Sequence, residues 1–164
     1  MNPTRLTETR RSKMDDRVRH ILDAARSTGA CAKTDGVSTL SDAVRLMFSP
    51  QGREFCIKHG YPTPNDLREI KGDLARHNVH VDAGDVECTN CDGVALIGGT
   101  QGRLSYSGTA RLYHVIVMHG AEVEVTASRY AVVNIDIYGA SVYVDNVDGT
   151  AKIYINGKKY GNGR

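Results

Sequence analysis

The spacing of hydrophobic and polar residues divides the chain into two parts. Up to about residue 77, hydrophobic residues recur every three or four positions, as they do along one face of a helix. From Asn78 onward they recur at every second position, as they do on one side of a β-strand. The sequence therefore predicts an α+β protein with a helical segment at residues 1–77, a strand-rich segment at residues 78–157 and a basic tail at residues 158–164.

Residues suited to helix starts stand just before the hydrophobic stripes of the first part. Thr39 has Asp42 three residues later, and Ser49 and Thr63 are each followed by proline. A hydroxyl before the first turn accepts hydrogen bonds from its free N–H groups, and proline suits the first helical position. We therefore expect helices to begin after these three residues, and an earlier helix to end near Thr28.

Short strands in the second part follow one another about every ten residues. Each is marked by two hydrophobic residues two positions apart, and turn-forming residues separate the pairs. Both members of a pair are expected to point into the core. The pairs are Val86/Cys88, Val94/Leu96, Leu104/Tyr106, Val115/Val117, Val123/Val125, Val133/Ile135, Val142/Val144 and Ile153/Ile155.

Every second strand matches better than the adjacent one. Residues 120–125 align with 139–144 at a shift of 19, and the pair at 115 and 117 aligns with the pair at 133 and 135 at a shift of 18. A fixed period that holds two strands is typical of a β-solenoid, here right-handed β-helix-like with roughly four coils. The alternative is an antiparallel β-sandwich, which has strands at similar spacing. The solenoid is favoured because its coils stack like on like.

Residues between the inward pairs are expected on two outer faces of the solenoid. One face is polar and acidic. It carries Glu87, Ser105, Glu122, Glu124, Ser141 and Tyr143.

The second outer face carries hydrophobic residues together with His114, Asn134 and Asp136. Neighbouring hydrophobic side chains on an outer face need a cover. Either the helical segment or a second copy of the chain would supply it. The expected interface residues are Ile97, Ile116, Met118, Val132 and Tyr154.

Charge and hydropathy narrow the range of partners and locations. The net charge is +2, and acidic residues interrupt the basic residues of the N-terminal helix, so nucleic acid is not the expected partner. No hydrophobic stretch approaches the roughly 20 residues that span a bilayer, and the charged start is unlike a signal peptide. We expect no membrane contact and a cytoplasmic or virion location.

Candidate chemistry in the sequence is sparse. Cys88 and Cys91 have the spacing of metal ligands, with His77, His80, Cys31 and Cys56 as conceivable partners. A structural zinc site commonly uses two such cysteine pairs, and only one is present. We therefore expect no metal and no cofactor.

A histidine–aspartate pair is the one candidate for catalysis. His114 and His119 flank a strand, and Asp136 is expected about one coil away, so they could act as general base and orienting group. No nucleophile elbow, phosphate loop or HExxH motif accompanies them. We therefore predict no catalytic residues and no enzyme, and a small hydrolase is the least favoured alternative.

Residues 47–56 (MFSPQGREFC), joined to a strand repeat that contains residues 117–121 (VMHGA), resemble uncharacterised proteins carried by bacteria and their phages. That resemblance implies a helical lead, a β-solenoid and a role in a phage particle or mobile element. Together these observations predict a non-enzymatic structural or protein-interaction protein that self-associates or joins a larger assembly. The alternative is a module that binds glycan or nucleic acid.

Overall fold

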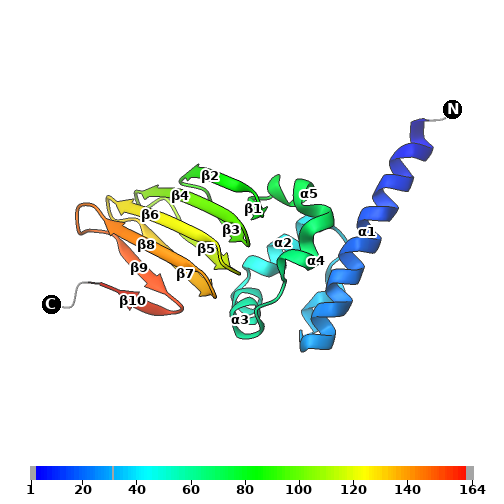
Figure 1. Cartoon of the computed structure of the whole chain (residues 1–164), viewed down its shortest axis with the longest axis horizontal. Helices are drawn as coiled ribbons and strands as arrows, with labels where there is room; N and C mark the ends of the chain where they lie inside the picture. Colours follow the sequence, from blue (N-terminus) through cyan, green and yellow to red (C-terminus); the bar gives the residue numbers. More distant parts are fainter. Residues whose placement is uncertain (1–2, 31, 162–164) are drawn as a thin grey trace. The chain divides into compact units, whose positions relative to one another are not determined.

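The computed structural model describes residues 3–30 and 32–161 (Figure 1). The chain forms two compact units, residues 1–62 and residues 63–164. The helical segment predicted at residues 1–77 is therefore shared between the units. Cys31, one of the conceivable metal ligands, lies outside the described residues.

The first unit is helical, and its second and third α-helices begin where the sequence predicts, after Thr39 and Ser49. Thr39 Oγ1 accepts the Asp42 N–H at 3.1 Å, and the Asp42 carboxylate accepts the Thr39 N–H at 3.3 Å. Ser49 Oγ accepts the Gly52 N–H at 3.1 Å, with proline at the next position. The elements are α1 (Pro3–Thr28), η1 (Ala32–Gly36), α2 (Leu40–Phe48) and α3 (Pro50–His59).

The second unit begins with three short helical turns, α4 (Pro64–Leu67), η2 (Arg68–Ile70) and α5 (Lys71–Ala75). Thr63 caps the first of them as expected, because its hydroxyl accepts the Asp66 N–H. The hydrophobic stripe of these turns is buried, and α5 packs against the first strand.

A β-solenoid of about four coils fills the rest of this unit, so the predicted fold is confirmed and the sandwich alternative is wrong. In the described part of the chain, strands alternate between two sheets. Sheet A has the order β1-β3-β5-β7-β9-β10 and sheet B has the order β2-β4-β6-β8. All neighbours are parallel except the last pair of sheet A. The strands are β1 (Val79–Val81), β2 (Gly84–Thr89), β3 (Val94–Ile97), β4 (Thr100–Ser107), β5 (Leu112–Met118), β6 (Glu122–Ser128), β7 (Val132–Tyr138), β8 (Ser141–Asn146), β9 (Lys152–Ile155) and β10 (Lys158–Tyr160).

The core lies between the two sheets and consists of the predicted inward pairs. Every residue of those eight pairs belongs to the core cluster or packs against it. The middle coils are fully closed, since Val115, Val125 and Ile135 are 0% exposed. Strict alternation along each strand produces this core, because every second side chain turns to the same side of a sheet.

The stacking register confirms one predicted shift and corrects the other. Glu122 aligns with Ser141, a shift of 19 as expected. Val115 aligns with Ile135, a shift of 20 where the sequence suggested 18. A change of two residues leaves every side chain on the same face, so the hydrophobic pattern does not separate 18 from 20.

Asparagine and aspartate side chains in the turns tie each coil to the next one. Asn90 Oδ1 accepts the Ser107 N–H at 2.8 Å, and Asn156 Oδ1 accepts the Ile137 N–H at 2.7 Å. Asp148 accepts the Arg129 N–H at 2.9 Å, and this hydrogen bond lowers the pKa of the Asp148 carboxyl. These bonds satisfy backbone donors where the ladders are interrupted.

The segment predicted as a basic tail contains a strand. β10 folds back on β9, with Lys158 opposite Ile155 and Tyr160 opposite Ile153. Among the described helices, none combines the length and the hydrophobicity of a bilayer-spanning segment.

One tyrosine of the core, Tyr106, has a buried hydroxyl that makes no hydrogen bond to the described residues. Burial raises the pKa of this hydroxyl. We expect Tyr106→Phe to raise the free energy of unfolding by about 1 kcal/mol, because an unpaired buried hydroxyl costs roughly that much or more. Urea unfolding measures the change, and a loss of stability in the variant would show that the hydroxyl has a partner.

Candidate functional site

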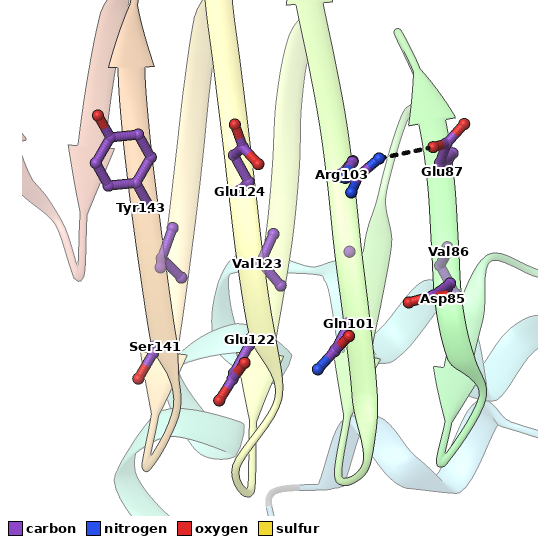
Figure 2. Close-up of a pocket in the computed structure, with 12 residues that line it drawn as sticks. Asp85, Val86, Glu87, Gln101, Arg103, Glu122, Val123, Glu124, Ser141 and Tyr143 are labelled. Atoms are coloured by element: carbon purple, nitrogen blue, oxygen red, sulfur yellow. Dashed lines mark ion pairs between the residues drawn. The ribbon is translucent and has the colours of Figure 1, made fainter.

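The outer face of sheet B is an exposed surface built from four strands of the solenoid. Because the strands are parallel and in register, side chains from neighbouring coils line up in rows across the sheet (Figure 2). The first row is Asp85, Gln101, Glu122 and Ser141. The second is Glu87, Arg103, Glu124 and Tyr143. The third is Thr89, Ser105, Thr126 and Asp145.

An open depression of about 710 Å³ runs over the first two rows. Its floor is formed by the backbone and by the core valines of β2, β6 and β8, with Gly102 of β4 between them. The side chains of the two rows stand along its length (Figure 2). The depression crosses all four strands, so a ligand that fills it is extended across the coils.

Negative charge dominates this face. Five carboxylates stand on the three rows beside a single guanidinium, that of Arg103. Arg103 Nη1 lies 3.5 Å from Glu87 Oε1, and both side chains are about three-quarters exposed, at 77% and 76%. An exposed ion pair of this kind contributes little to stability. Within the first two rows the acids stand on β2 and β6, with Gln101 or Arg103 of β4 between them. Because adjacent strands are about 4.8 Å apart, the acids of one row are roughly 10 Å apart.

The sequence placed six of these residues correctly and missed the others. Glu87, Ser105, Glu122, Glu124, Ser141 and Tyr143 all lie on the outer face of sheet B, as predicted. Asp85, Thr89, Gln101, Arg103, Thr126 and Asp145 complete it. Alternation could have found them, since each stands two residues, or four in the case of Gln101, from a predicted member on the same strand.

The second outer face lies on sheet A and has the predicted orientation. Within the single chain Ile97, Ile116 and Met118 are 0% exposed, whereas Val132 and Tyr154 are half-buried. The chain itself therefore covers the first three residues. That any of the five contacts a second molecule stays a prediction.

The cysteine pair does not take the form of a metal site. Cys88 and Cys91 are joined by a disulfide across the end of β2. Two of the conceivable partner ligands lie in different units. Cys56 is buried in the first unit. His80 lies in the second unit, where burial lowers the pKa of its imidazole. Among the described residues, acidic, histidine and cysteine side chains form no group of three or more that could hold a metal ion.

The candidate catalytic residues His114 and Asp136 lie on neighbouring strands of sheet A but are not paired directly across the ladder. His114 aligns with Asn134 of the next strand, whereas Asp136 aligns with Ile116. His119 lies in the turn after β5, where its ring stands 5.4 Å from that of Tyr138. The register thus places Asp136 two positions beyond the level of His114, on the same outer face.

Sequence and structure comparisons assign no relative to the chain. No protein-family model matches it, and no curated protein or solved structure is similar to it. Function is therefore inferred from the geometry of the surfaces alone.

Proposed function

We propose that this is a non-enzymatic interaction protein whose outer sheet B face binds an extended, positively charged segment of a partner protein. The observation that carries the proposal is the group of four carboxylates on β2 and β6 that line an open depression crossing the coils. A surface with five acids and one base attracts cations and repels phosphate. The same charge argues against nucleic acid as the ligand of this face.

Exposed charges of this kind affect the rate of association more than the equilibrium affinity. Rim-type charge pairs steer encounter and make it dependent on salt, while each pair contributes at most about 1 kcal/mol. Several acids are therefore needed for useful binding, and the depression provides four of them, two on β2 and two on β6. An extended basic segment could place one cation near each acid in turn.

The proposal is tested with a fluorescein-labelled peptide in which lysine and serine alternate. Reversing charge in the double variant Glu122→Lys, Glu124→Lys should weaken binding at least tenfold by fluorescence anisotropy, and added salt should weaken binding to the wild type. The matched control is Glu54→Lys, Glu69→Lys, which makes the same charge change at exposed positions that belong to helices and not to sheet B.

Two outcomes would overturn the proposal. Equal weakening in both double variants would show that net charge alone attracts the peptide. Salt-independent binding of a neutral oligosaccharide that Tyr143→Ala abolishes would instead identify a glycan-binding face, since Tyr143 is 69% exposed beside the carboxylates.

The finer proposal is that this interaction serves a phage particle, as the resemblance implies. Its test is the gene neighbourhood. Capsid and tail genes on both sides would support it, and a neighbourhood of housekeeping genes would contradict it.

A further inference from the structure

At the C-terminal end of the solenoid, sheet A continues for two strands beyond the last strand of sheet B. In the described part of the chain, sheet A has six strands and sheet B has four. β1 and β2 form the first coil, one strand in each sheet. The two additional strands of sheet A, β9 and β10, therefore come after β8, the last strand of sheet B (Figure 1). We call these two strands the C-terminal ledge. At about 4.8 Å per strand, the ledge extends roughly 10 Å past the level of β7.

The core is open above this ledge. Val125 is 0% exposed, but Val144, which aligns with it in the next coil, is only half-buried. Ile155 on β9 is likewise half-buried. Tyr160 and Lys158 of β10 share the inward side of the sheet with Ile153 and Ile155, and Tyr160 is 48% exposed. Inward-facing residues of β8 and of the C-terminal ledge therefore border a space in the core that no side chain of the described residues fills.

The backbone of β8 has hydrogen-bonding groups to offer at the same place. Ser141 N–H donates to Ala121 at 3.0 Å and Val147 N–H donates to Ala127 at 3.0 Å, so odd-numbered residues face β6. In a parallel ladder, alternate residues point to opposite sides of the strand. The N–H and C=O groups of Val142 and Val144 therefore point toward the free edge, and β8 pairs with β6 alone among the described strands.

The other sheet edges carry features that discourage pairing, whereas β8 does not. β10 has Lys158 and Lys159, and α5 packs against β1. β2 carries Asp85 and Glu87 on its exposed side. Charged residues and covering elements are the usual protection of an edge. The six residues of β8 include one charge and no proline.

We propose that the free edge of β8 accepts an extended segment of another polypeptide, which adds a fifth strand to sheet B above the C-terminal ledge. Alternate hydrophobic residues of that segment would face Val144, Ile155 and Tyr160. Its backbone would pair with the outward groups of Val142 and Val144, the mode known as β-augmentation. This proposal does not depend on the proposed binding of a basic segment to the outer face.

The ledge determines which occupant fits. If a second copy paired β8 with β8, its own ledge would have to occupy the same space, because two paired strands are only about 4.8 Å apart whereas each ledge reaches further than that. A single extended strand fits without that overlap. Its outward residues would stand beside Ser141, Tyr143 and Asp145, so a cation or a hydroxyl suits the position next to Asp145.

The test uses a labelled seven-residue peptide in which valine alternates with lysine and threonine, and a scrambled peptide with its valines in one block. Anisotropy should show saturable binding of the alternating peptide to the whole protein and at least tenfold weaker binding of the scrambled one. Val144→Pro should reduce binding at least tenfold, because it removes an edge N–H that the fold does not use. The matched control Val144→Ile keeps both that N–H and a β-branched hydrophobic side chain, and should stay within about threefold of wild type.

Amide hydrogen exchange on the unaltered protein supplies a second measurement. The Val142 and Val144 amides should exchange rapidly in the free protein and become at least tenfold more protected when the alternating peptide is present. Unchanged exchange at both amides, or binding that Val144→Pro leaves intact, would overturn the proposal. A dimer of the protein alone that Val144→Pro abolishes would overturn it too, since the occupant would then be a second copy.

The same peptide separates this proposal from the proposed function. The double variant Glu122→Lys, Glu124→Lys should retain at least a third of the wild-type affinity for the alternating peptide, because β8 and the ledge are unaltered. Loss of binding in this variant, with Val144→Pro unaffected, would place the peptide on the outer face and contradict strand addition.

Discussion

Ile116→Asp is expected to lower the free energy of unfolding by about 4 kcal/mol or more, which is among the largest effects of single substitutions. Ile116 is 0% exposed, so the new carboxylate would lose its hydration. Its neighbour across the ladder is Asp136, which places two like charges side by side. Thermal unfolding measures the loss, and light scattering shows whether the oligomeric mass changes as well.

The pH dependence gives this prediction a second test. Burial and Asp136 both raise the pKa of the introduced carboxyl in the folded protein above its unfolded value. The deficit relative to wild type is therefore largest above that raised pKa and shrinks as the pH falls and the carboxyl becomes protonated.

The control for Ile116→Asp is Glu122→Lys on the exposed face of sheet B. It should change stability by no more than about 0.5 kcal/mol, as surface substitutions usually do. An Ile116→Asp variant with wild-type stability and mass would show that the outer face of sheet A is not covered in solution. A severe effect of Glu122→Lys would show that the strand register is shifted by one residue.

Ile135→Ala is expected to lower the free energy of unfolding by about 2–5 kcal/mol, the usual cost of removing a buried isoleucine side chain beyond Cβ. Ile135 is 0% exposed in the centre of the core, between Val115 and Ile155 in the neighbouring coils. The side chains around it belong to regular sheets on both sides, so they have little freedom to collapse into the cavity.

The matched control is Ile137→Ala, two residues further along the same strand and on the same side. Ile137 is only half-buried, so its truncation should cost about 1 kcal/mol. Urea unfolding of the two variants gives the comparison. If Ile137→Ala cost as much as Ile135→Ala, Ile137 would be as deeply buried as Ile135, and its partial exposure in this structure would be contradicted.

Several features were determined by the sequence itself because they depend on short-range pattern. Thr39, Ser49 and Thr63 begin helices through hydrogen bonds to residues three positions away. The division into inward and outward residues follows from strict alternation, so the sequence alone predicts that Val115 and Ile116 point to opposite sides of the sheet. The acidic character of one face followed from the same alternation.

Tertiary structure alone decided how the strands stack and where stacking stops. Shifts of 18 and 20 place the same side chains inward, so only the hydrogen-bonded ladder selects Ile135 as the neighbour of Val115. Arg103 meets Glu87 only because residues 16 positions apart become adjacent in the sheet. The fold of β10 onto β9, and with it the open edge of β8, depends on pairings between distant segments that compete for the same backbone groups. The local hydrophobic pattern does not encode which strand a segment pairs with, because alternation sets only the side of the sheet to which each side chain points.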